Sequence, residues 1–492
     1  MRVRPRETPR WSLTELAAEL DAVATDEAAV TGISLNTHQL EPGDLYAALP
    51  GARAHGATYA VAALDRGATA VLTDPDGAGL IDGLPMIVVD EPRKALAALS
   101  SRFYGNPSSS FTTVGITGTQ GKTTTTYLAE AALGDRVSAV VGTIGTRIAK
   151  VPAASSLTTP EAPQLQALFA VMREEVVELC AMEVSSHALV QGRVDGFVFD
   201  VAVFLNLGRD HLDFHTDLED YFLAKAALFT PQHARRAVIN IDDPHGRRLR
   251  ELTPLPVTTF STDGSSADWR AVNIRPHRVG TDLEVLGPGG VAIDLSVPLP
   301  GVFNVSNALA VIAALSEAGH DAGELAAGIA ASTGVPGRME HVEAGQPFTA
   351  IVDYAHKPDA VTAVLTALRP VTAGRLIIVI GAGGDRDHGK RPLMGQAAAR
   401  HADVVIVTDD NPRTERAALI RASVLEGASA GPGVAVEVDG RREAIARAVA
   451  MAHLGDTVVV AGKGHERGQE VGGIVHPFDD REVLVELIGE RA

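Results

Sequence analysis

The chain of 492 residues is longer than one hydrophobic core usually supports, which predicts about three domains. Hydrophobic residues make up 46% of it and charged residues 21%, as in globular domains, while the formal net charge of −18 argues against nucleic acid or anionic lipid as a partner. The single cysteine, Cys180, excludes an intrachain disulfide, and no stretch reaches the roughly twenty apolar residues that span a bilayer, so we expect a cytoplasmic protein.

The first 108 residues are predicted to form a small α/β domain, because short helical and strand patterns alternate there. Helices are expected at residues 12–20, 59–66 and 93–104, and strands at 30–37, 42–49, 70–73 and 86–89. The turn-rich segment 105–108 is a candidate domain boundary. No residue of this first segment has a catalytic role by its chemistry alone.

A glycine-rich loop is the main feature of the second segment, residues 109–334. The apolar run 111–116 leads into TGTQGKTT at residues 117–124, and a helical pattern follows at 125–133. Strand, glycine-rich turn, lysine and threonine, then helix is the order of a phosphate-binding loop, in which backbone N–H groups and the lysine hold phosphates. Ile116 stands where the strict motif has its first glycine, so the loop matches a shortened variant.

Polar clusters follow two further apolar runs of this segment. The runs predict a buried parallel sheet with strands at residues 138–142, 178–184 and 198–205. MEVSSH (182–187) ends one run and NLGRDHLDFH (206–215) follows the next, at the strand ends where open α/β sheets bind ligands. Glu183 is therefore a candidate Mg²⁺ ligand, although either cluster alone also fits a solvated loop. Additional strands and a hairpin are expected at residues 238–242, 257–260 and 282–297.

Lys225 lies in a predicted helix, residues 221–229, among apolar neighbours. A lysine that extends its ammonium to the surface is the more usual explanation of this pattern. A partly buried lysine is the alternative; its pKa is depressed, and its neutral amine can react with CO₂ to form a carbamate able to bind metal. The residues alone leave both possibilities open.

The third segment, residues 335–492, alternates strands with helices and is predicted to be a doubly wound, Rossmann-like domain. Strands are expected at 350–353, 375–380, 404–408, 434–438 and 457–461, and helices at 358–368, 392–400, 413–426 and 441–452. The glycines at 381–385 lack the G-x-G-x-x-G spacing, so dinucleotide binding is not expected.

Ten motifs in this order carry a resemblance that covers essentially the whole chain. They are the clusters at 117–124, 183–187, 206–215, 221–229, 301–307, 337–340, 353–358, 383–394, 410–413 and 462–466. The chain resembles the Mur ligases of peptidoglycan synthesis, in particular the MurE type, which adds the third amino acid. The resemblance implies three domains, at residues 1–108 (UDP-sugar-binding), 109–334 (ATP-binding) and 335–492 (amino-acid-binding), and a monomer. It also implies ATP-dependent addition of meso-diaminopimelate to the D-Glu carboxylate of UDP-N-acetylmuramoyl-L-Ala-D-Glu, through an acyl phosphate.

The resemblance assigns residues to ATP, to Mg²⁺ and to catalysis. ATP would contact Gly118, Thr119, Gln120, Gly121, Lys122, Thr123, Thr124, Asn304, Asn307, Arg338 and Asp353. Two Mg²⁺ ions would be held by Thr123, Glu183, His211 and a carbamylated Lys225. The catalytic set would be Lys122, Glu183, His211, Lys225 and His356, the last on a loop able to close over the nucleotide and exclude water.

The UDP-sugar dipeptide would lie on residues of the first two domains. The matching positions are Leu35, Thr37, Ala52, Arg53, Ala54, Thr158, Thr159, Ser185, Gln191 and Arg193. The sequence departs from the commoner family pattern at residues 35–37, where Leu-Asn-Thr replaces Asp-Ser-Arg, and at Gln120, which replaces Asn in the phosphate loop.

The motif DNPR at residues 410–413 matches the family's meso-diaminopimelate signature. The other matching contacts are Arg386, Asp410, Asn411, Pro412, Gly462 and Glu466. Arg413 would grip the distal carboxylate in a bidentate way and reject lysine, which ends in an ammonium alone, while Glu466 suits the distal ammonium. The alternative is that Arg413 simply pairs with Asp409 or Asp410.

Two other functions are compatible with parts of this pattern. One is a different member of the superfamily, such as a lysine-adding ligase or a folylpolyglutamate-type synthetase. The other is a catalytically silent nucleotide-binding regulator, against which the joint presence of Lys122, Glu183, His211 and Lys225 argues.

Overall fold

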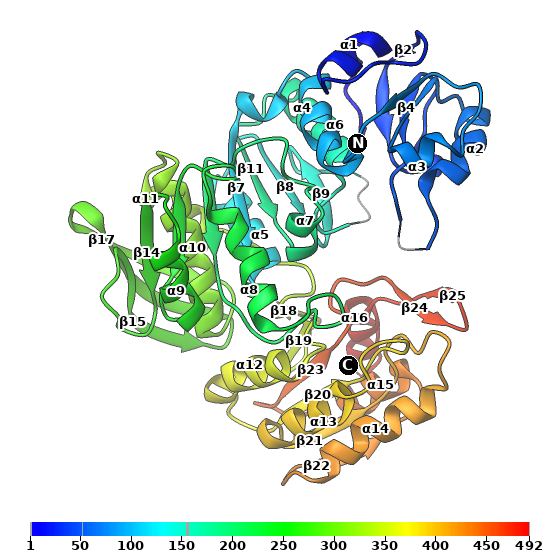
Figure 1. The fold of residues 1–492 in the computed structure, drawn as a ribbon. Coiled ribbons are helices and arrows are strands. Elements are labelled where there is room, and N and C mark those ends of the chain that lie inside the picture. Colours follow the sequence, from blue (N-terminus) through cyan, green and yellow to red (C-terminus); the bar gives the residue numbers. More distant parts are fainter. Residues whose placement is uncertain (1, 52, 154–156, 492) are drawn as a thin grey trace. The chain divides into compact units, whose positions relative to one another are not determined.

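The computed structural model describes residues 2–51, 53–153 and 157–491. It divides into two compact units, one holding the chain up to Trp269 together with Ala310–Leu325, the other Arg270–Leu309 together with the chain from Ala326. Each unit is built around parallel-stranded sheets with helices on their faces (Figure 1), which confirms the predicted α/β class. The boundaries expected at residues 108 and 334 stay predictions.

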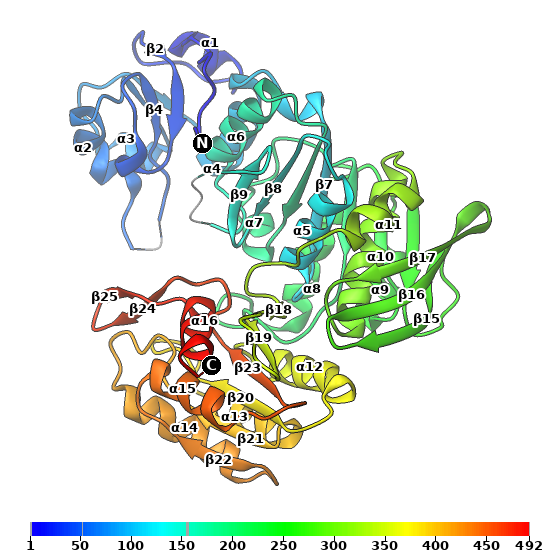
Figure 2. The ribbon, with the colours of Figure 1, turned by 180° about the vertical axis from the view of Figure 1, so that it is seen from behind.

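A four-stranded parallel sheet, in the order β3-β4-β5-β6, begins the first unit. Its strands are β3 (Gly32–Ser34), β4 (Asp44–Ala47), β5 (Ala70–Thr73) and β6 (Met86–Val88). Its helices are α1 (Leu13–Ala18), α2 (Ala60–Asp65), α3 (Pro75–Ala78) and α4 (Pro92–Phe103), and β1 (Trp11–Ser12) pairs with β2 (Ala29–Val30). Apolar clusters fill both faces, with α2 and α3 on one and α1 and α4 on the other (Figure 2).

The second sheet has eleven strands, of which the part in this unit runs in the order β10-β9-β8-β11-β7-β12-β13-β14. Pairing is parallel from β8 to β14 and antiparallel at β8–β9–β10. The strands are β7 (Thr112–Thr117), β8 (Ser138–Gly142), β9 (Gly145–Ile148), β10 (Val151–Ala153), β11 (Leu179–Glu183), β12 (Val201–Phe204), β13 (Ala237–Asn240) and β14 (Val257–Ser261). The helices are α5 (Lys122–Ala132), α6 (Ala162–Glu174), α7 (Ser186–Val190), α8 (Leu218–Ala226) and α9 (Pro244–Leu252).

Strand β7 lies between β11 and β12, and its carboxyl end carries the phosphate loop. Glu183 at the end of β11 is level with Ile116, and Phe204 at the end of β12 is level with Thr117. The register therefore brings the two polar clusters to either side of the loop, as the sequence predicts. Cys180 is buried inside β11, and burial raises the pKa of its thiol to about 12, so it is a core residue.

The second unit contains an antiparallel meander and a six-stranded sheet. The meander is β15 (Trp269–His277), β16 (Gly280–Gly287) and β17 (Val291–Val297). The helices that follow it in the chain are α10 (Val302–Glu317) and α11 (Ala322–Ala330), and the stretch Ala310–Leu325 of these helices belongs to the first unit. The larger sheet, in the order β18-β19-β23-β20-β21-β22, is parallel except at β18. Its strands are β18 (Glu340–His341), β19 (Thr349–Asp353), β20 (Leu376–Ile380), β21 (Val404–Val407), β22 (Val434–Glu437) and β23 (Thr457–Ala461).

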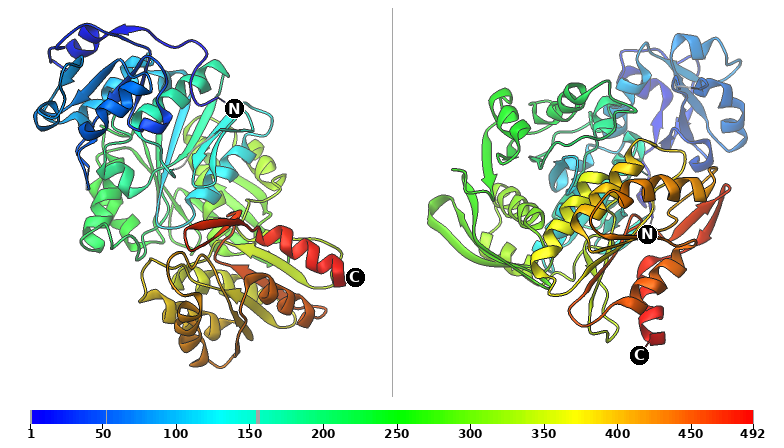
Figure 3. Two further views of the ribbon diagram at one scale, coloured as in Figure 1. Left: turned by 90° about the vertical axis from the view of Figure 1, so that its right-hand side faces the viewer. Right: turned by 90° about the horizontal axis from the view of Figure 1, so that it is seen from below.

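Helices cover both faces of the six-stranded sheet, which confirms the doubly wound prediction. Helices α12 (Pro358–Leu368), α13 (Lys390–His401) and α14 (Ala417–Ser429) lie on one face, and α15 (Arg441–Met451) and α16 (Asp480–Arg491) on the other (Figures 1 and 3). A hairpin of β24 (Gly468–Val471) and β25 (Ile474–Pro477) follows β23.

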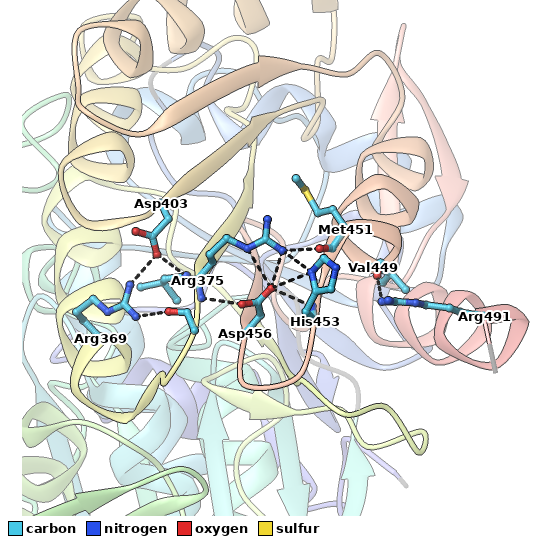
Figure 4. A network of polar contacts seen from close by, with 10 residues as sticks. Arg369, Arg375, Asp403, Val449, Met451, His453, Asp456 and Arg491 are labelled. Carbon is cyan, nitrogen blue, oxygen red and sulfur yellow. Dashed lines mark hydrogen bonds and ion pairs between the residues drawn. The ribbon is translucent and has the colours of Figure 1, made fainter.

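A polar network fixes the amino-terminal edge of this sheet (Figure 4). The guanidinium of Arg375 donates to Asp456 Oδ2 at 2.8 Å and to the carbonyl of Met451 at 2.5 Å, and Arg369 donates to Asp403 at 2.7 Å. Asp456 resists ionisation through burial, but its hydrogen bonds from Arg375 and from the His453 backbone outweigh this and lower its pKa. These contacts are structural, and the opposite edge carries the predicted ligand loops.

Candidate active site

The conformation of the phosphate loop depends on a glycine within it and on an asparagine that follows the neighbouring strand β12. Helix α5 begins at Lys122, directly after Gly121, whose φ of +88° would strain any residue with a side chain. Asn206, just past β12, accepts hydrogen bonds at its Oδ1 from the backbone N–H groups of Thr119 (3.1 Å) and Gln120 (2.9 Å). Its Nδ2 donates to the carbonyl of Gln120 at 3.2 Å. Asn206 thus sets the shape of the loop.

Two lysines converge on one carbonyl of this loop. Lys122 Nζ donates to the carbonyl oxygen of Gly118 at 2.8 Å, and Lys225 Nζ, from α8, donates to the same oxygen at 3.0 Å. Only 1% of the Lys225 surface is exposed, and its ammonium lies 4.5 Å from the ring centre of Tyr221. The Tyr221 hydroxyl lies 3.2 Å from the Thr119 hydroxyl. The explanation of Lys225 as a surface lysine is therefore wrong, because the side chain is buried against the phosphate loop.

Next to Lys122 in the chain, the hydroxyl of Thr123 lies beside a carboxylate, and both oxygens are potential metal ligands. Glu183, which is 1% exposed, accepts a hydrogen bond at Oε1 from the Thr123 hydroxyl at 2.9 Å. The same carboxylate accepts from the backbone N–H of Thr143 at 2.8 Å and from its hydroxyl at 3.1 Å. A hydroxyl and a carboxylate next to a phosphate loop are the hard oxygen ligands that suit Mg²⁺, so this donor pair fits the ion.

Histidines cluster between the two polar segments. His211 lies 3.2 Å from Asp210, and its ring centre is 4.8 Å from that of His187. Burial, together with nearby His215, lowers the pKa of His187. Among the residues that the structure describes, no group of three or more His, Cys, Asp or Glu side chains is placed to hold a metal ion. The predicted ligand set of Thr123, Glu183, His211 and carbamylated Lys225 therefore stays a prediction.

The two polar segments, 182–187 and 206–215, are joined by side-chain contacts of His215 that the sequence analysis missed. His215 Nε2 lies 2.9 Å from the Ser186 hydroxyl, and its Nδ1 lies 3.2 Å from Asp220. Ser186 and His215 are buried. These contacts fix the 206–215 loop against the end of β11. The sequence did not predict these contacts, because a histidine five residues before an aspartate, as His215 is before Asp220, is not a recognisable pattern.

Half of the predicted sugar-dipeptide residues lie together at the end of β11. The Thr159 hydroxyl donates to the carbonyl of Glu183 at 2.9 Å and accepts from the Ser185 N–H at 3.1 Å. Arg193 donates to the carbonyl of Thr159 at 2.9 Å and to Gln191 Oε1 at 2.6 Å. The Thr158 hydroxyl lies 3.2 Å from that of Thr143, which links this group to Glu183. Of the predicted positions in the first domain, Leu35, Arg53 and Ala54 lie in loops after β3 and β4, Thr37 begins a short 3-10 helix (Thr37–Gln39), and Ala52 is outside the described residues.

Two predicted nucleotide residues of the second unit, Arg338 and Asp353, interact at the end of β19. The carboxylate of Asp353 accepts from the backbone N–H groups of Met339 (2.8 Å) and Ala355 (2.7 Å), and burial raises its pKa against the opposing effect of Arg338. The Arg338 guanidinium lies 4.5 Å from the ring centre of Tyr354. Asn304 and Asn307 are buried on α10, where Asn307 Nδ2 donates to Asn304 Oδ1 at 3.3 Å.

A close approach of two glycines brings the Arg338 segment onto the 462–466 motif. A Cβ on Gly337 would lie 2.1 Å from the backbone nitrogen of His465, and one on Gly464 would lie 2.7 Å from the carbonyl oxygen of Gly337. Both residues have positive φ, 64° and 53°. Only glycine fits both positions without a shift of the backbone, which explains why Gly337 and Gly464 stand at these two places.

His356 should be neutral in the folded protein and should make its stability depend on pH. Burial, with Lys357 and Lys390 close by, lowers its pKa to about 4, and its Nδ1 donates to the carbonyl of Tyr354 at 2.7 Å. Because an unfolded histidine has a pKa of ~6.5, the unfolded chain binds the extra proton first, and stability falls as pH drops from ~6.5 through the folded value. NMR titration of the ring should give a midpoint near 4, and a His356→Gln variant should show a flatter loss of stability on acidification. A midpoint near ~6.5 would contradict the burial argument.

The predicted amino-acid site lies at the carboxyl edge of the six-stranded sheet. Arg413, which has a positive φ of 52°, donates from Nη1 to the carbonyl of Gly384 at 2.6 Å, and its Nε lies 3.2 Å from Glu470 Oε2. The carboxylate partner of Arg413 is thus Glu470 and not the alternatives Asp409 or Asp410, and Asp409 pairs with Arg421 at 2.6 Å. The guanidinium is thus held in a fixed orientation between β24 and the 381–389 loop.

The remaining predicted residues of this site lie on the loops that follow β20, β21 and β23. Asn411 Nδ2 donates to Glu466 Oε2 at 2.9 Å, and the carbonyl of Asp410 accepts from Gln469 at 2.6 Å. A Cβ on Gly462 would lie 2.6 Å from Asp410 Oδ2, so the two loops are in close contact. Pro412 packs against Gly384, and Arg386 is exposed on the adjacent loop.

Three family models match successive parts of the chain. They are described as "Mur ligase family, catalytic domain" (residues 29–104), "Mur ligase middle domain" (116–315) and "Mur ligase, glutamate ligase domain" (337–464). Together they cover most of the chain and fall in the three predicted segments.

Full-length relatives are also similar to the chain. A Streptomyces avermitilis protein named UDP-N-acetylmuramoyl-L-alanyl-D-glutamate--2,6-diaminopimelate ligase is 52% identical over 494 residues, covering 99% of this chain and 98% of the relative. A solved structure of a ligase of that name is 34% identical with a TM-score of 0.68, covering 94% and 95% of the two chains. The fold also matches a Thermotoga maritima MurF ligase in complex with ADP, at 18% identity and a TM-score of 0.63, covering 93% of this chain and 97% of that one.

Proposed function

Because the chain belongs to the Mur ligase family, we propose that it adds meso-diaminopimelate to UDP-N-acetylmuramoyl-L-Ala-D-Glu, with ATP driving amide bond formation. The observation that carries the substrate assignment is the 52% identity, over nearly the whole length of both chains, to a relative named for this reaction. The proposed domain roles are sugar binding for residues 1–108, ATP binding for 109–334 and amino-acid binding for 335–492. A monomer acting in the cytoplasm is part of the proposal, and in the described part of the chain no helix has the length and apolarity to cross a membrane.

The proposed reaction has two steps. The free D-Glu carboxylate attacks the γ-phosphorus of ATP, which releases ADP and leaves an acyl phosphate. The neutral amine of diaminopimelate then attacks the acyl carbon, inorganic phosphate leaves with the C–O bond electrons, and the nitrogen gives up one proton as the amide forms. Both steps bring anions together, so the site must neutralise charge and align the reactants.

The chain's own residues meet these demands around the phosphate loop. Lys122 is held 2.8 Å from the Gly118 carbonyl, within the loop whose phosphates it would contact. Thr123 and Glu183 would hold Mg²⁺, and His211 and carbamylated Lys225 would complete the two sites; the ion supplies positive charge to the transferring phosphoryl group. Ser185, Thr159 and Arg193 would hold the peptide carboxylate near this point.

A ligation assay tests the proposal directly. Purified chain, ATP, Mg²⁺ and UDP-N-acetylmuramoyl-L-Ala-D-Glu are combined in turn with meso-diaminopimelate, L-lysine or L-glutamate, and ADP release and product mass are followed. We expect product with meso-diaminopimelate. Preference for lysine or glutamate would identify a different superfamily member, and no ADP release with any amino acid would indicate a silent regulator.

Arg413→Lys should raise the KM for meso-diaminopimelate by about ten- to a hundredfold, the loss of one charged hydrogen bond. The reason is that an ammonium cannot reproduce the planar fork of the guanidinium, which Gly384 and Glu470 hold in place. Arg369→Lys, at the opposite edge of the same sheet, is the matched control and should leave this KM unchanged. An unchanged KM in Arg413→Lys would show that Arg413 does not contact the substrate.

A further inference from the structure

Lys463 is a fully buried cation in the amino-acid site and belongs to none of the predicted contacts. It follows the end of β23, between Gly462 and Gly464, and its side chain is 0% exposed. Its ammonium donates to Asn411 Oδ1 at 3.1 Å and to Glu466 Oε2 at 3.2 Å. Burying an ammonium is unfavourable unless it is paired and hydrogen-bonded, so the position of Lys463 depends on these two partners.

The contacts of Lys463 orient both partners. Asn411 Oδ1 also accepts from the backbone N–H of Glu470 at 3.0 Å, and its Nδ2 donates to Glu466 Oε2 at 2.9 Å. The oxygen and the nitrogen of the Asn411 amide are therefore both hydrogen-bonded, and Glu466 Oε2 accepts from both Asn411 and Lys463. The carboxylate is fixed in direction and is electrostatically paired before any substrate arrives.

A different residue, Arg441, holds the backbone of the two loops that carry the 410–413 and 462–466 motifs. Arg441 donates to the carbonyl of Asp409 at 3.1 Å and to that of Ala461 at 3.0 Å, and it is paired with Asp480. These carbonyls stand immediately before the 410–413 and 462–466 motifs. The loops are thus anchored without Lys463, whose own hydrogen bonds go to side chains.

We infer that Lys463 is a positioning and specificity-determining residue that acts through Glu466 on the distal end of the amino-acid substrate. This inference rests on the proposed function. Lys463 with Glu466, and Arg413 with Glu470, form two ion pairs that each sum to zero charge. A zwitterionic end, with one ammonium and one carboxylate, enters such a site without leaving a net charge, whereas the lone ammonium of lysine leaves an excess positive charge.

Lys463→Met tests the inference, because it removes the charge with little change of volume. We expect the KM for meso-diaminopimelate to rise at least about tenfold, because the Glu466 carboxylate loses its charged partner and one of its two donors, while the KM for ATP stays within about twofold. The preference for meso-diaminopimelate over L-lysine should fall, because Glu466 is then uncompensated. In a Glu466→Gln background, Lys463→Met should change the KM and the selectivity little further. If Lys463 had only a structural role, its replacement would add its own loss in that background as well.

Controls separate this inference from the proposed function. Arg375→Met removes a cation from the opposite edge of the same sheet and should leave the KM for meso-diaminopimelate and the selectivity unchanged. Wild-type protein without ligase activity would refute the proposed function. Active wild type with unchanged KM and selectivity in Lys463→Met would overturn the role of Lys463. Lys463→Gln is made alongside, and failure of both variants to fold would also overturn it, since Lys463 would then serve folding alone.

Discussion

Lys225→Ala should slow amide bond formation by about a hundred- to a thousandfold, the effect of removing one preorganised charged group from a phosphoryl-transfer site. The side chain is buried, and its nitrogen lies 3.0 Å from the Gly118 carbonyl, the same oxygen that Lys122 contacts at 2.8 Å. Carbamylation, in which the neutral amine adds to CO₂ and gives up a proton, would attach a carboxylate to this nitrogen beside the phosphate loop and replace a positive charge with a negative one. Steady-state ADP release with all substrates present measures the loss.

Chemical rescue separates the carbamate role from simple packing. If Lys225 provides a carboxylate, acetate or bicarbonate should restore part of the rate of Lys225→Ala, because a small anion can enter the space that the side chain leaves. Tyr221→Phe is the matched control: it keeps the ring beside Lys225 and removes only the hydroxyl near Thr119, so added carboxylates should not change its rate. Wild-type rates in Lys225→Ala would refute the role.

The strands could be predicted well from the sequence because they are buried on both faces. The apolar runs 70–73, 138–142 and 457–461 match β5, β8 and β23 residue for residue. Their β-branched and aliphatic composition leaves few other structures that bury so many side chains together. The order of polar clusters after β7, β11 and β12 also predicted which segments meet at the phosphate loop, since carboxyl ends of adjacent parallel strands share one edge.

Helix starts and hairpins were less predictable, because tertiary contacts decide them. A helix was expected from residue 413, but α14 begins at Ala417: Arg413 has positive φ, and its backbone N–H donates to the Glu470 carbonyl at 3.0 Å. Conversely α5 begins at Lys122, three residues before the expected start, because the helix terminus is itself part of the phosphate loop. The hairpins β9–β10 and β24–β25 contain mixed, partly exposed residues and gave no apolar run.

The site residues that the sequence analysis missed act through other side chains. Asn206 shapes the phosphate loop, His215 joins two loops, and Lys463 pairs with Glu466; all three lie inside motifs that were recognised. Composition can indicate that a buried polar residue is present, but not which partner it meets from a distant strand. Such contacts require the register of the sheet.

Asp480→Asn should destabilise the six-stranded sheet by about 3–5 kcal/mol, the cost of leaving one charge of a buried pair without its partner. Arg441 and Asp480 are both 0% exposed in their side chains and are joined by bonds of 2.7 Å from Nε and Nη2. Hydrogen exchange of the amides of β19, β20 and β23 is the measurement, because it reports opening of this sheet apart from the rest of the chain. Exchange should accelerate by about a hundred- to several-thousandfold.

The neighbouring Arg442 provides a matched control, since it pairs with Glu486 on the exposed side of the same helix. Arg442→Met should leave the exchange rates unchanged because water already screens that pair. Replacing both buried partners, Arg441→Met with Asp480→Leu, should recover much of the loss, because no charge is then left buried. The recovery should stay incomplete, as the carbonyls of Asp409 and Ala461 lose their donor, at about 1 kcal/mol each. Full recovery would mean that Arg441 does not anchor the two substrate loops, and the wild-type exchange rate in Asp480→Asn would mean that the pair does not support the sheet.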